Sequence, residues 1–146
     1  MLGTLAILVA RLLFGGAFLV AMVMKFLAIG DTAAAIAAIG FPLPLFFAWV
    51  AALFELGLVL AFLSGAFFIE AAALAAAYVL FLGFAFYGPS SWANGAIQMG
   101  FFINHLTFFA GLLFASVHGP GKLALNWRLP WRAFGRRASS YVSGAE

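Results

Sequence analysis

Long apolar runs dominate the chain, and short polar or proline-containing breaks separate them. The first run extends from Leu2 to about Gly30 and is interrupted only by Arg11 and Lys25. A helix needs about 20 apolar residues to cross a bilayer, so this run is long enough to span. A cleaved signal peptide would carry a basic residue before a shorter apolar core. We therefore expect a retained first span.

The first break contains a short alanine-rich stretch. Within residues 31–43, Asp31 or Thr32 can cap a helix that Gly40 and Pro42 would end. At about eight residues, such a helix is too short to cross the membrane. We expect it to lie at the membrane interface, or to enter the membrane and return, between the first and second spans.

Turn-forming residues divide the remaining chain into three more runs of spanning length. Pro44 suits the first turn of a helix, and Ser64 with Gly65 interrupts an apolar stretch too long for one crossing. Gly88 and Pro89 open a polar loop. The predicted fold is an all-α integral membrane four-helix bundle. Its membrane domain is residues 1–121, with spans at about 2–30, 44–66, 68–87 and 99–117, and residues 122–146 form a basic tail.

The composition agrees with a membrane protein and excludes other classes. Apolar residues make up 67% of the 146 and charged residues 8%, against about 25% charged in soluble domains. A soluble globular domain and a disordered chain are both excluded. With no cysteine, disulfides, thiolate metal sites and cysteine nucleophiles are excluded as well.

The basic residues predict the topology. Five of the seven follow the fourth span: Lys122, Arg128, Arg132, Arg136 and Arg137. The positive-inside rule places this tail in the cytoplasm, and an even number of spans places the N-terminus there too. Trp127 and Trp131 suit the headgroup region. This tail therefore indicates topology and anionic lipid rather than nucleic acid.

Two opposite charges fall inside the predicted spans. Arg11 lies roughly 12 Å from the cytoplasmic side of span one, and Glu55 lies roughly 14 Å from the same side in a core about 30 Å thick. An unpaired ion at that depth is costly. We therefore expect Arg11 and Glu55 to form a buried ion pair. The pair would hold spans one and two in register, or Glu55 would be a protonatable or ligand-contacting group.

A second polar group is predicted near the outer face. Lys25 lies at the end of span one, and Asn104 and His105 lie about 8 Å into span four. These three residues are candidates for a pocket that takes a quinone headgroup. Alternatively, Lys25 reaches to the interface and His105 bonds to a neighbouring helix. Tyr78, in the middle of span three, needs a hydrogen-bond partner in the interior. Carboxylates and imidazoles do not cluster, so we expect no metal site.

Several motifs, in order, resemble the DoxX family of small four-helix membrane proteins. Glu55 is one of them, and Asn104 early in span four is another. The remaining motifs are Arg11 with Gly15, Gly16 and Lys25, then Gly-Phe-Pro-Leu-Pro at 40–44, and Gly-Pro-Gly-Lys-Leu at 119–123. Glu70 departs from the pattern, since the family often has a basic residue where span three begins. The resemblance implies a multi-pass protein of the bacterial inner membrane that is associated with quinone-linked oxidoreductases, such as thiosulfate:quinone oxidoreductase.

Three functions remain open from the sequence. The first is a quinone-associated subunit of a membrane oxidoreductase or respiratory-type complex, with a bound quinone or lipid and with the redox centre on another subunit. The second is an accessory subunit that packs laterally on a larger membrane complex without chemistry of its own. The third is a small transporter that uses Glu55, although the chain has no detectable internal repeat. Each would have the lipid bilayer as a partner.

Overall fold

The computed structural model describes residues 2–125, and all of its regular structure there is helical. The tail residues that we expect to meet lipid, Trp127 and Trp131 with the four arginines, lie outside the described residues. The elements are α1 (Leu2–Leu27), α2 (Ile29–Ala38), α3 (Pro44–Ser64), α4 (Phe68–Tyr87), the short 3-10 helix η1 (Pro89–Asn94) and α5 (Ala96–His118). Helices α1, α3, α4 and α5 are long and apolar enough to cross a membrane. The predicted fold class is therefore confirmed.

The breaks fall where glycine and proline place them, with small differences at helix ends. Helix α3 begins with Pro44 at its first turn and ends at Gly65, whose φ of 80° lets its N–H bond back to Ala61. Helix α1 ends at Leu27 and α2 begins at Ile29, so the first span is shorter than predicted and α2 begins earlier. Asp31 therefore lies in the first turn of α2 rather than capping it.

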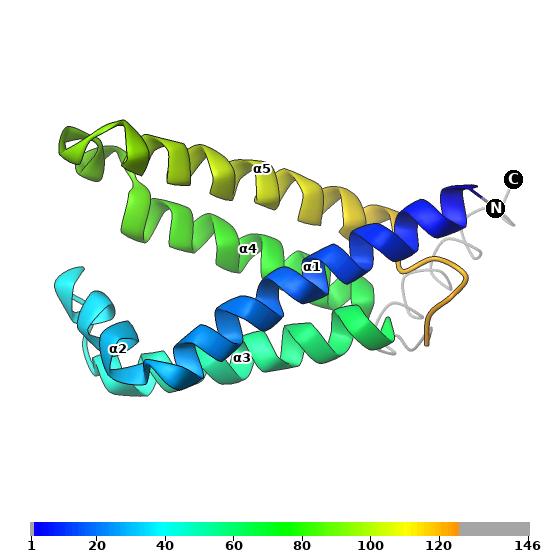
Figure 1. The fold of residues 1–146 in the computed structure, drawn as a ribbon, viewed down its shortest axis with the longest axis horizontal. Coiled ribbons are helices and arrows are strands. Elements are labelled where there is room, and N and C mark those ends of the chain that lie inside the picture. The colour runs from blue at the N-terminus through cyan, green and yellow to red at the C-terminus, as the bar shows by residue number, and fades with distance from the viewer. Residues whose placement is uncertain (1, 126–146) are drawn as a thin grey trace, which may run out of the picture.

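The helices form two antiparallel pairs (Figure 1). Helix α1 packs along α3, α4 packs along α5, and a shorter contact between α3 and α4 joins the pairs. The start of α1 and the segment after α5 lie at one end of the bundle, and α2 and η1 lie at the other. This arrangement agrees with an even number of crossings.

The core is made of aromatic rings and small residues. Phe18 and Phe62 stack with ring centroids 5.7 Å apart, and both are nearly fully buried. Helix α4 buries a stripe of alanines at helical spacing, Ala71, Ala72, Ala75 and Ala76. Small side chains let backbones approach closely, and membrane helices use such packing because lipid provides no hydrophobic force between them.

Large apolar side chains cover the outside of the bundle. Leu13 is 68% exposed, Phe114 67% and Val117 80%. Extensive apolar exposure of this kind suits contact with lipid tails rather than water. The described chain is therefore a membrane-spanning bundle.

Candidate functional site

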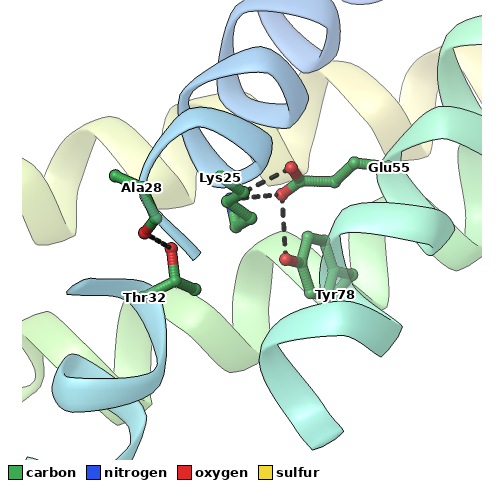
Figure 2. Close-up of polar contacts among 5 residues, drawn as sticks. All are labelled: Lys25, Ala28, Thr32, Glu55 and Tyr78. Atoms are coloured by element: carbon green, nitrogen blue, oxygen red, sulfur yellow. Dashed lines mark hydrogen bonds and ion pairs between the residues drawn. The ribbon is translucent and has the colours of Figure 1, made fainter. Parts of the chain in front are cut away.

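The carboxylate of Glu55 is the centre of a buried polar cluster. Glu55 lies on α3 and is 1% exposed. The ammonium group of Lys25, on α1, donates to its two oxygens at 2.8 and 3.0 Å. The hydroxyl of Tyr78, on α4, donates to Oε1 at 2.9 Å. Figure 2 shows both side chains pointing toward the carboxylate, so the cluster joins three helices.

The cluster has unused hydrogen-bonding capacity. An ammonium group has three N–H donors, and Lys25 uses two of them in hydrogen bonds to the carboxylate of Glu55. The Lys25 side chain is 20% exposed, whereas that of Glu55 is 2% exposed. Lys25 therefore keeps one donor for a ligand, and it is more accessible than the carboxylate that it pairs with.

The predicted ion pair between Arg11 and Glu55 is wrong. Arg11 is buried, but it donates to the backbone carbonyls of Pro120 at 3.2 Å and Leu63 at 3.4 Å. The predicted membrane depths of Arg11 and Glu55 assumed that α3 starts at the same depth at which α1 ends. In the structure Lys25, near the end of α1, lies beside Glu55 in the middle of α3, so α3 extends roughly 13 Å beyond α1. Helix α2 packs against α3.

At the opposite end of the bundle, two buried side chains have polar atoms without a hydrogen-bond partner. Within residues 2–125, Nε of Arg11 and both carboxylate oxygens of Glu70 are buried without a hydrogen-bond partner. Arg11 nevertheless ties α1 to the last turn of α3 and to the loop after α5. We assign Arg11 a structural role, because it lines neither of the two cavities described next.

A cavity of about 870 Å³ lies beside the Glu55 cluster. Most of its lining is apolar and aromatic, including Phe18, Phe54, Phe81 and Phe108. Its polar lining residues are Lys25, Asp31, Thr32, Glu55, Tyr78, Tyr87 and His105. Ligand sites are typically cavities of about 300–1,000 Å³ with apolar walls and a few polar groups. The cavity therefore has the size and chemistry of a small-molecule site.

The structure separates the three residues predicted to form one pocket. Lys25 and His105 line the large cavity, while Asn104 lines a second cavity of about 450 Å³, which His105 also borders. Nδ1 of His105 lies 2.8 Å from the carbonyl oxygen of Phe101. A carbonyl can only accept, so Nδ1 is the donor in this contact, and Nε2 is left for another partner.

A partner for Tyr78 could be expected from the sequence, whereas the aromatic lining of the cavity could not. The need of Tyr78 for an interior partner was visible in the sequence, and Glu55 meets it. The aromatic lining of the cavity was not visible, because phenylalanines at helical spacing look alike whether they face lipid, core or cavity. Within residues 2–125, no three histidine, aspartate or glutamate side chains lie together in a way that could hold a metal ion.

Replacing Tyr78 with phenylalanine will lower the stability of the bundle by about 2 kcal/mol, because it removes a hydrogen bond to a buried charged group. The measurement is the thermal unfolding midpoint of the purified protein in detergent. Tyr87→Phe, which removes a hydroxyl from the last residue of α4, is the matched control and should change little. Equal midpoints for the two variants would contradict the role given to Tyr78.

The sequence model of one known family, DoxX, matches residues 6–88, which is more than half of the chain. The matched segment includes Arg11, Lys25, Glu55 and Tyr78. Asn104 and the Gly-Pro-Gly run at residues 119–121 lie outside it. No curated protein and no solved structure is significantly similar to the chain.

Proposed function

The chain belongs to the DoxX family, and on this premise we propose that it is a quinone-binding subunit of an oxidoreductase in the bacterial inner membrane. The observation that carries the proposal is the large cavity with the Lys25–Glu55–Tyr78 cluster in its wall. On this proposal the chain supplies the quinone site, and a partner subunit supplies the redox centre.

The lining of the cavity suits a quinone ring. The aromatic side chains offer flat apolar surfaces, on which rings stack in offset or edge-to-face arrangements. The third N–H of Lys25 can donate to a quinone carbonyl oxygen, and Nε2 of His105 can accept from a quinol hydroxyl. The charge of Lys25 is balanced by Glu55, so the site favours a neutral headgroup over an anionic one.

Quinone binding is tested with the purified protein in nanodiscs. Wild-type protein should retain long-tailed ubiquinone above the level of empty nanodiscs. His105→Ala should weaken retention about tenfold, equivalent to roughly 1.4 kcal/mol, because one polar contact is lost.

The chain offers its own control for this test. His118, on the same helix, also bonds through Nδ1 to a backbone carbonyl four residues earlier, but it lines neither cavity. His118→Ala should bind quinone like wild type. Retention no higher than in empty nanodiscs, or equal loss in the two variants, would refute the proposal.

A second candidate, an accessory subunit, is favoured by the outer surface of α5. Large apolar side chains on this helix, among them Ile97 at 74% and Val117 at 80% exposure, are available to a neighbouring membrane protein. Purification in mild detergent followed by mass spectrometry of the intact complex separates the two candidates. A stoichiometric complex whose turnover is unaffected by His105→Ala would favour the accessory subunit.

A further inference from the structure

The two cavities are neighbours that share part of their lining. The smaller cavity lies between α1, which contributes Phe14 and Ala17, and α5, which contributes residues from Asn104 to Gly111. Ala17, His105 and Phe108 line both cavities. These three side chains therefore form a threshold between the large cavity and the smaller one.

Helices α1 and α5 leave this space open. In the described part of the chain their backbones make no close approach, unlike the backbones of α1 and α3 or of α4 and α5. Aromatic side chains bridge the gap instead: Phe108 lies 5.3 Å from Phe14 and 5.6 Å from Phe18, centroid to centroid. Side chains can change rotamer far more readily than packed helices can separate, so the bridge is a passable barrier.

The residues around the smaller cavity connect it with the lipid-facing surface. Ala17, Asn104 and Thr107 are exposed, although all three belong to spanning helices. An amide such as that of Asn104 is costly when it faces hydrocarbon, and in membrane spans polar groups usually face a cavity or a partner. A path by which polar headgroups enter from the membrane explains why the amide of Asn104 lies at this position.

We propose that the space between α1 and α5 is a lateral portal through which the tail of the bound ligand extends into the bilayer. This inference rests on the proposed quinone site and narrows its ligand to quinones with a long isoprenoid tail. The headgroup lies in the large cavity beside Lys25, and the tail crosses the threshold and runs along α5 past Thr107. A cavity of about 870 Å³ holds a headgroup with the first part of its tail, so a long tail has to leave it.

Thr107→Phe tests the portal because it fills the smaller cavity from α5, at a position that does not line the large cavity. The hydroxyl that it removes bonds to the carbonyl oxygen of Ile103 on the same helix. In nanodiscs, this variant should bind long-tailed ubiquinone about tenfold more weakly than wild type. It should bind the tail-less dimethoxy-methyl-benzoquinone headgroup as wild type does. Ala10→Phe, at an exposed position on α1 that lines neither cavity, is the control for an added aromatic ring and should leave both affinities unchanged.

The outcomes separate the portal from the site itself. If wild-type protein binds neither quinone, the proposed function fails. If wild type binds both, and Thr107→Phe weakens neither or weakens both equally, only the portal is overturned. Should Thr107→Phe not yield folded protein, Thr107→Leu fills the same space with a smaller side chain and carries the same expectation.

Discussion

Replacing Lys25 with methionine will destabilise the bundle by about 3 kcal/mol, because it leaves the buried carboxylate of Glu55 without its counter-charge. Replacing Lys25 with methionine and Glu55 with glutamine together will cost much less. The amide oxygen of glutamine still accepts the hydrogen bond from Tyr78, and no charge remains in this cluster. The expected signature is a double variant that is more stable than the Lys25 single variant.

The measurement is the unfolding midpoint in detergent for wild type, both single variants and the double variant. Lys122→Met, at an exposed position after α5, controls for the general loss of a positive charge and should change the midpoint little. If Lys25→Met were as stable as Lys122→Met, the ion pair with Glu55 would not stabilise the fold.

Alanine at Gly65 will destabilise the bundle by about 3 kcal/mol for two separate reasons. Gly65 ends α3 with a φ of 80°, where any residue with a Cβ is strained by about 1 kcal/mol or more. A Cβ there would also press on Ala124 and lie 2.9 Å from Nη1 of Arg11, and overpacking of this kind typically costs about 1–3 kcal/mol. The substitution would therefore disturb the contacts that Arg11 makes with Leu63 and Pro120.

Gly40→Ala separates these two causes. Gly40 has a φ of 79°, almost the same as that of Gly65, but nothing lies within 4 Å of the Cβ that it would acquire. This variant should lose only the cost of backbone strain, about 1 kcal/mol. The difference between the two unfolding free energies then measures the packing at Gly65. Equal losses of unfolding free energy in the two variants would show that the residues around Gly65 accommodate an added methyl group without cost.

The sequence by itself determined the class of the protein and the number and approximate limits of its spans. Hydropathy and length require four crossings, and glycine and proline mark their ends, so the span predicted at residues 68–87 coincides with α4. These signals are local, because each depends on a short window of residues and on the thickness of a bilayer.

Only the tertiary structure decided which polar groups meet. Arg11, Lys25 and Glu55 were all recognised as charges within or at the end of a span, but the sequence paired Glu55 with Arg11 and placed Lys25 in a separate pocket near the outer face. Which cation contacts Glu55 depends on the axial offset between α1 and α3. Many side-chain contacts along the two helices set that offset together, so it cannot be predicted from any single residue. The tertiary structure likewise decided that α1 and α5 make no close backbone approach in the described residues, and the smaller cavity lies between these two helices.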